Sequence, residues 1–166
     1  MFRNSASRSS CWRRTNPAGG TYGRDSGQVN PGWRMLPSEI PAKYGSNRGA
    51  AVLDKATDLI FGLIERHGVV CDHERPGFVH AGFGNTFLES WVREWGELGV
   101  TVERYDHQGL RDMIGTDFYH PGMREPRSGH LQPLYYTRGM AHTALEKGAM
   151  VYGRTRATSI HQEGKG

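Results

Sequence analysis

The feature that most constrains the fold is an amphipathic segment at residues 48–67. Its apolar residues recur at spacings of three and four, which gathers them on one face of an α-helix. Gly68 then ends the helix. The apolar face comprises Val52, Leu53, Ala56, Leu59, Ile60, Leu63 and Ile64, and the opposite, solvated face comprises Asp54, Lys55, Asp58, Glu65 and Arg66. The segment therefore predicts a helix that packs along one side.

Shorter segments after this helix alternate between strand and helix patterns. Thr86 and Glu89 have capping-box spacing, Asp106 can cap a further helix, and Pro133 suits a first helical position. Strands are predicted at residues 78–82, 100–105, 119–125, 149–152 and 157–160, and helices follow Thr86, Asp106 and Pro133. The pattern has no internal repeat and predicts a mixed α/β (α+β) fold, with a mixed sheet and three main helices.

The apolar periods also predict how the longest helices pack. We expect the helices at residues 48–67 and 133–147 to cover a sheet that includes residues 100–105 and 149–152. The side chains that this packing buries are Leu59, Leu63, Met140 and Leu145.

Charge and composition divide the chain near residue 20. The net charge is +4, and no acidic residue precedes Asp25, although the same stretch contains five arginines. We therefore expect residues 1–20 to form a disordered basic arm, and residues 21–166 to form the folded part, which begins with a loop at residues 21–41. A basic arm containing Trp12 leaves nucleic-acid binding as a function of another class, although the folded part has no basic face.

The two cysteines, Cys11 and Cys71, lie far apart and form no CxxC pair, so a reducing compartment is expected. No apolar run approaches the roughly 20 residues that cross a bilayer, so we expect no membrane association and a cytoplasmic protein. The arginine- and serine-rich start leaves a targeting segment open. His73 and His80 follow Cys71 without zinc-site spacing, so no metal is expected.

A glycine-rich loop at residues 22–32 carries the first chemical signal. Glycines let backbone amides approach a pyrophosphate or a flavin ring closely, and an arginine adds charge-assisted hydrogen bonds. The loop resembles the Ser-Gly-Arg-Asn-Gly-Gly-Gln segment of D-amino-acid oxidase-like FAD oxidoreductases, in particular their gamma-glutamylputrescine oxidase branch; Tyr22, Asp25 and Ser26 depart from it. The resemblance implies that the cofactor-binding residues are Gly23, Arg24, Asp25, Ser26, Gly27 and Gln28.

Two later segments extend this resemblance over residues 16–166. Residues 114–123 are similar to the family's Gly-Thr-Asp-x-Tyr-His-Gly-Gly-Leu segment, and residues 128–134 are similar to its Gly-His-Leu-x-Pro-Leu turn into a helix. In such enzymes this turn lies near the flavin ring and the substrate cavity. The resemblance therefore implies that His130 faces the substrate, although a lone histidine before a helix is more often a satisfied surface residue.

The resemblance implies FAD as the cofactor and oxidation of the C–N bond of a small amine or amino acid, with hydride transfer to the flavin. The GxGxxG unit that such enzymes place first is not found in this sequence, so we expect a partial fold without the N-terminal Rossmann βαβ unit. Weak or absent FAD binding by the isolated chain follows. A non-catalytic remnant, or a split enzyme whose complementary chain carries the nucleotide-binding unit, is the alternative, and the residues leave the catalytic group unassigned.

Overall fold

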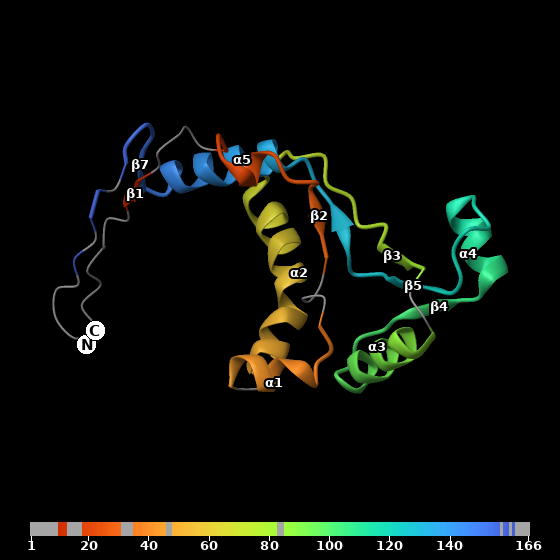
Figure 1. The fold of residues 1–166 in the computed structure, drawn as a ribbon. Helices are drawn as coiled ribbons and strands as arrows, with labels where there is room; N and C mark the ends of the chain where they lie inside the picture. The colour runs from red at the N-terminus through yellow and green to blue at the C-terminus, as the bar shows by residue number, and fades with distance from the viewer. Residues whose placement is uncertain are drawn as a thin grey trace. The chain divides into compact units, whose positions relative to one another are not determined.

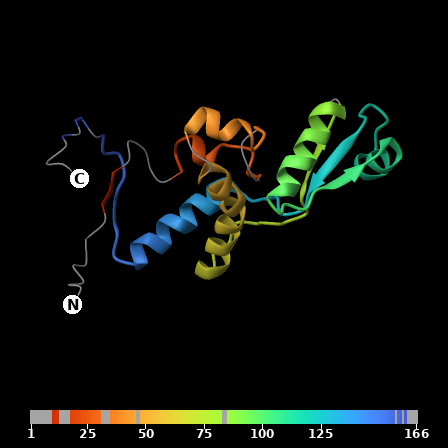
Figure 2. The ribbon, with the colours of Figure 1, turned by 90° about the horizontal axis from the view of Figure 1, so that it is seen from below.

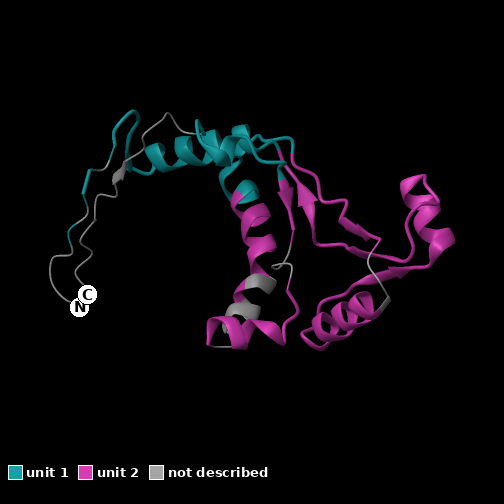
Figure 3. Ribbon diagram, viewed as in Figure 1, with its two compact units in different colours: residues 1–27, 64–72, 132–166 teal, residues 28–63, 73–131 magenta. Residues whose placement is uncertain are grey.

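The computed structural model describes residues 10–12, 18–30, 35–45, 48–82, 85–156, 158–159 and 161 (Figure 1). The chain divides into two compact units. Unit 1 contains residues 1–27, 64–72 and 132–166, and unit 2 contains residues 28–63 and 73–131 (Figure 3). In the described ranges no helix combines the length and the apolar character needed to cross a membrane.

Unit 2 is built on an antiparallel three-stranded sheet with the strand order β3-β5-β4. The strands are β3 (Phe78–Ala81), β5 (Gly122–Glu125) and β4 (Glu103–Tyr105). Helix α3 (Asn85–Glu97) lies against this sheet (Figure 2), and its buried Leu88, Trp91 and Trp95 form one core with Met123 of β5. Ile40 of α1 (Glu39–Tyr44) and Val100 complete that core. The apolar period of α3 therefore supplies three of the six buried residues of this core.

Helix α4 (His107–Ile114) follows β4 in unit 2 and has the termini that the sequence predicts. The Asp106 side chain accepts a 2.8 Å hydrogen bond from the Gly109 amide, which satisfies one of the unpaired donors of the first turn. Gly115 ends the helix with φ of 75°. Leu110, on the inner face, is fully buried and contacts β5 at Gly122. The predicted cap is confirmed.

Unit 1 centres on α5 (Pro133–Glu146), which packs on η1 (Thr21–Gly23). Pro133 occupies the first turn as predicted, and the Gln132 side chain caps the helix by accepting from the Tyr135 amide. The final turn of α2 (Arg48–His67) and the residues after it belong to this unit, where the Gln132 amide donates to the Cys71 carbonyl. Strands β1 (Ser10–Trp12) and β7 (Met150–Tyr152) pair in parallel.

The mixed α/β class is confirmed, but the single mixed sheet is wrong. The described strands form three separate sheets: β3-β5-β4, β1 with β7, and β2 (Gln28–Val29) with β6 (Gly129–His130). The strand predicted near residues 149–152 therefore does not share a sheet with the strand near residues 100–105. Alternation in a sequence identifies a strand but does not identify its hydrogen-bonding neighbour.

Two of the four predicted buried side chains are exposed. Leu59 is 61% exposed and Leu145 is 49% exposed, whereas Leu63 and Met140 are half-buried. The buried side of α2 instead carries Phe61 and Ile64, together with Thr57, in the described part of that helix. Leu59 lies roughly 160° around the helix from Phe61, so α2 has apolar side chains on two sides and packs only one of them here.

Smaller predictions also need correction. Ser10–Trp12 form a strand within the arm expected to be irregular, and Glu39 begins a helix inside the expected loop. Thr158 and Ser159 are not in a strand, while residues 157 and 160, like residues 1–9 and 13–17 of the predicted arm, lie outside the described residues. The division at residue 20 stays a prediction.

Candidate functional site

The predicted cofactor loop is a tight turn in unit 1 that is held by its own side chain. Asp25 accepts a 2.8 Å hydrogen bond from the amide of Gly27, which is buried and has φ of 71°. Arg24 and Ser26 are exposed. A carboxylate that closes a turn two residues ahead is a local Asx-type interaction. Asp25 therefore stabilises the turn and occupies one of its glycine amides.

These residues do not form an open amide cradle for a pyrophosphate. A side-chain carbon added at Gly23 would overlap the Ala18 carbonyl oxygen, so the glycine allows the chain to approach itself. The Gly27 amide is already bonded to Asp25. A dinucleotide site needs several unpaired amides pointing at one position, normally at a helix start. This loop alone therefore does not fit the phosphate half of a dinucleotide cofactor, and Arg24 is its one exposed cation.

The fold brings Gln28 and His130 together, although they are far apart in the sequence. In unit 2 these two predicted site residues are opposite one another in the antiparallel pairing of β2 with β6, next to the pair of Val29 with Gly129. Both Gln28 and His130 are exposed. The structure therefore places one predicted cofactor residue beside the predicted substrate residue, on one pair of strands.

The backbone of His130 is fixed from two directions. Its amide donates to the Glu74 carbonyl at 2.9 Å, and its carbonyl accepts from the Glu74 amide at 3.0 Å, while β2 pairs on the other side. A side-chain carbon at Gly129 would overlap the Glu74 carbonyl oxygen and would come within 2.8 Å of the Phe61 ring. Only glycine therefore fits before His130, and the imidazole projects from a rigid backbone, which is what a binding group needs.

A buried carboxylate fixes the turn that leads to His130. Glu125 is 3% exposed, and its Oε1 accepts from the Arg127 amide at 3.1 Å and from the Arg127 Nε at 2.9 Å. A buried charge is stable only when it is paired and hydrogen-bonded, as here. The next residue, Ser128, is fully buried, and its hydroxyl has no protein hydrogen-bond partner within the described ranges. The hydrogen bonds of Glu125 therefore hold Arg127, three residues before His130.

A second polar network on the unit 2 sheet was missed by sequence reasoning. Arg124 donates from Nη1 to both Glu103 carboxylate oxygens, at 2.9 and 3.0 Å, and Tyr105 donates to Oε2 at 2.8 Å. Arg124 also donates to the Pro76 carbonyl. The hydrogen bond from Arg124 lowers the pKa of Glu103, and the hydrogen bond to Glu103 raises the pKa of Tyr105. Spacing of two along β4 was the available signal, because it places Glu103 and Tyr105 on one face.

The network of Arg124, Glu103 and Tyr105 has a structural role. Every strong donor of Arg124 is directed at Glu103 or Pro76, so the guanidinium is occupied by its own fold. An arginine that recognises a substrate carboxylate needs its planar fork free. The arrangement therefore joins β4, β5 and the segment before β3, and we assign it no role in binding.

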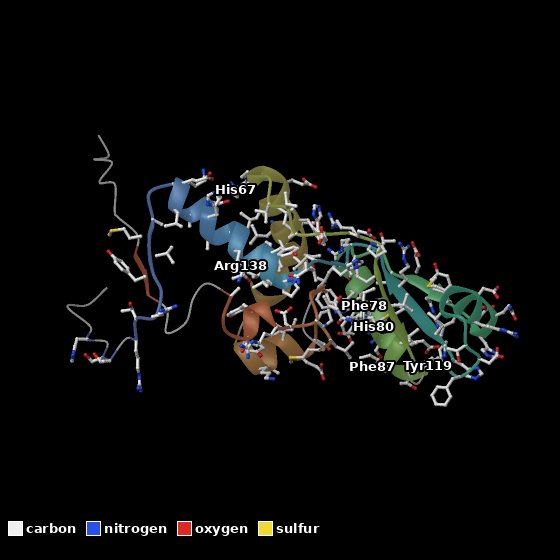
Figure 4. All side chains as sticks on the ribbon, turned by 90° about the horizontal axis from the view of Figure 1, so that it is seen from above. His67, Phe78, His80, Phe87, Tyr119 and Arg138 are labelled. Carbon is white, nitrogen blue, oxygen red and sulfur yellow. The ribbon has the colours of Figure 1, made fainter. Side chains whose placement is uncertain are left out.

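An aromatic group extends over β3 and α3. The rings of Phe78 and His80 meet edge to face at 4.4 Å, and the His80 ring lies 5.6 Å from that of Trp91. Trp91 in turn contacts Phe87 at 5.8 Å. Figure 4 labels Phe78 and His80 on β3, Phe87 on α3, and Tyr119 in the segment before β5. His80 is thus part of an aromatic contact surface, as a surface or packing histidine would be.

Cys71 has the properties of a structural thiol. It is 1% exposed, and burial, followed by the charge of Asp72, raises the pKa of its thiol. A nucleophilic cysteine instead requires a lowered pKa and access to its substrate. Among the residues that the structure describes, no three His, Cys, Asp or Glu side chains are grouped to hold a metal ion.

Comparison with known proteins places this geometry in context. The sequence pattern of the family described as "FAD dependent oxidoreductase" (DAO) matches residues 12–166. The chain is 27% identical over 154 residues to a probable oxidoreductase OrdL of Rhizobium meliloti (strain 1021), covering 87% of this chain and 36% of the relative. It is 24% identical over 148 residues to gamma-glutamylputrescine oxidoreductase of Escherichia coli (strain K12), covering 85% and 34%. The chain thus spans about a third of the length of these curated relatives.

Solved structures share the fold. Glycine oxidase from Geobacillus kaustophilus superposes with a TM-score of 0.75 at 15% identity, covering 93% of this chain and 42% of that one. L-amino acid deaminase from Proteus myxofaciens superposes with a TM-score of 0.73 at 18% identity, covering 95% of this chain and 35% of that one. Identities this low establish the fold alone. The predicted partial oxidoreductase fold is confirmed, whereas the roles of Gly23 to Gln28 and of His130 stay predictions.

Proposed function

This chain belongs to the DAO family of FAD-dependent oxidoreductases, and on that premise we propose that it is part of an enzyme that oxidises the C–N bond of an amine or amino acid. The observation that carries the proposal is the match over residues 12–166, together with a fold shared with glycine oxidase and L-amino acid deaminase. FAD, when bound, accepts the hydride that leaves the substrate carbon. The proposed location is the cytoplasm.

Two residues of unit 2 are the proposed contacts of the substrate and the cofactor. His130 and Gln28 lie opposite one another on β6 and β2, with exposed side chains. An imidazole can accept a hydrogen bond from an amine or donate one to a carboxylate, and a glutamine amide can do either. We propose that His130 orients the substrate and that Gln28 lies on the cofactor side of it. Phe61 and Glu74 fix this position through Gly129.

A second function is favoured by the exposed side of α2. Val52 is 66% exposed and Leu59 is 61% exposed, and the two are one heptad apart on the side away from the buried Phe61. Exposed apolar residues aligned on a helix are typical of a surface that another segment covers. The alternative is therefore a subunit without activity of its own, which works with a complementary chain carrying a nucleotide-binding unit, or a non-catalytic remnant.

One experiment with two arms tests these proposals. In the first, the purified chain is titrated with FAD, and flavin absorbance and fluorescence are recorded. We expect weak or no binding, because the loop at residues 23–28 has no open amide cradle and each lost charge-assisted hydrogen bond costs about 1.5–3 kcal/mol. A yellow protein with stoichiometric FAD would show that this chain holds the cofactor alone, contrary to the expectation.

The second arm uses the Rhizobium meliloti relative, which is 27% identical to this chain. Flavin reduction is followed without oxygen against gamma-glutamyl amines, glycine derivatives and matched alcohols. Reduction by amines but not by alcohols supports the C–N assignment, and replacing the residue aligned with His130 by glutamine should raise KM more than it lowers kcat. Reduction by alcohols alone would overturn the assignment.

A further inference from the structure

A cavity in unit 1 is separate from the predicted cofactor loop and from His130. Its volume is about 480 Å³, and it lies between the end of α2 with the following residues and one side of α5. The α5 residues that line it recur at spacings of three and four, so they form one stripe along the helix: Tyr135, Arg138, Gly139, His142, Thr143 and Glu146. His67 at the end of α2 and Arg138 on α5 are labelled in Figure 4.

The cavity depends on the close approach of two segments. A side-chain carbon at Gly139 would lie 2.5 Å from Cγ1 of Val69, so glycine allows the residues after α2 to approach α5. Val69 is buried at this contact, and Val70 beside it is 83% exposed. Val69 and Val70 therefore give the cavity an apolar part.

The charged groups of the lining favour an anion at one end. Arg138 is exposed and has no ion-pair partner in the parts of the chain described, whereas Glu146 is paired with His142 at 3.3 Å. A guanidinium fork suits a carboxylate, and the apolar part of the cavity with the Tyr135 ring suits an apolar body. A dianion would be opposed by Glu146, so a singly charged ligand fits best.

We propose that this cavity is a binding site for a small organic carboxylate, with Arg138 holding the carboxylate and Val69, Val70 and Tyr135 contacting its apolar part. The site lies wholly within unit 1 and uses none of Gln28, His130 or the loop at residues 23–27. The proposal does not depend on FAD or on the oxidation of an amine.

The test is a titration of the full chain with benzoate, followed by NMR or calorimetry, with neutral benzamide as the matched ligand. We expect benzoate to bind and benzamide to bind at least about tenfold more weakly, because only the first pairs with Arg138. The substitution R138Q should weaken benzoate binding by about tenfold or more, while E146Q should strengthen it by removing a negative charge.

Arg93→Gln on α3 is the control, because that arginine is exposed and lies in unit 2. It should leave benzoate binding unchanged, and circular dichroism of all variants checks that the helices are intact. Equal binding of benzoate by the native chain and R138Q, equal binding of benzamide, or no binding of benzoate at millimolar concentration would each overturn the proposal.

Discussion

At the scale of single residues, ionisation of Glu103 and Tyr105 links stability to pH in opposite directions. The pKa of Glu103 is lowered in the folded chain by the hydrogen bond from Arg124. The contribution of Glu103 to the free energy of unfolding is therefore present above its unfolded pKa and is lost as pH falls through its folded pKa. The pKa of Tyr105 is raised by its hydrogen bond to Glu103, so its contribution is lost as pH rises through the folded pKa.

We therefore expect the denaturation midpoint to fall on both the acid and the strongly alkaline side of neutrality. In the variant E103Q, the free energy of unfolding should depend less on pH on the acid side. The difference in free energy of unfolding between E103Q and the native chain should shrink as pH falls, because the native Glu103 becomes protonated and loses its charge. Urea titrations between acid and neutral pH measure this. Glu89→Gln is the control, since its pair with Arg104 spans 3.9 Å and is exposed; equal pH slopes for both variants would contradict the assignment.

At the scale of elements, local residues set both ends of α4. Asp106 accepts from the Gly109 amide at 2.8 Å, and removing such a cap typically costs about 1 kcal/mol. We expect Asp106→Ala to lower the free energy of unfolding by that amount, measured by chemical denaturation, and Asp106→Asn to restore most of it.

Asp112 on the same helix is the matched control. Within the described part of the chain it accepts only from the exposed Gln108 side chain, four residues earlier, so Asp112→Ala should cost about 0.5 kcal/mol or less. Equal losses at positions 106 and 112 would show that the cap has no special role.

At the scale of the whole molecule, exposed apolar side chains predict self-association. Leu59 and Val52 are exposed on one side of α2, whereas Leu63 is half-buried. We expect concentration-dependent association by sedimentation, reduced in Leu59→Gln with a stability change within about 0.5 kcal/mol. Leu63→Gln, by contrast, should lower stability more than it lowers association. A native chain that stays monomeric at high concentration, or an effect of Leu63→Gln on association alone, would contradict this.

The sequence by itself determined the local elements of this protein and the family to which it belongs. The 48–67 helix, the Asp106 cap and Pro133 at the start of α5 depend on interactions within a few residues, and such interactions are visible as spacings. The order of the segments at residues 22–32, 114–123 and 128–134 also indicates the DAO family, and the match over residues 12–166 agrees.

Only the tertiary structure decided which faces are covered and which distant residues meet. Leu59 and Phe61 are both apolar, and nothing local distinguishes the packed side of α2 from the exposed one. The pairing of Gln28 with His130 arises because β2 and β6 are hydrogen-bonded, and Gly129 lets the segment at Glu74 and the Phe61 ring approach β6 closely. Strand partners and helix faces are selected by contacts between segments far apart in the chain, so the free energy that selects them belongs to no single stretch of sequence.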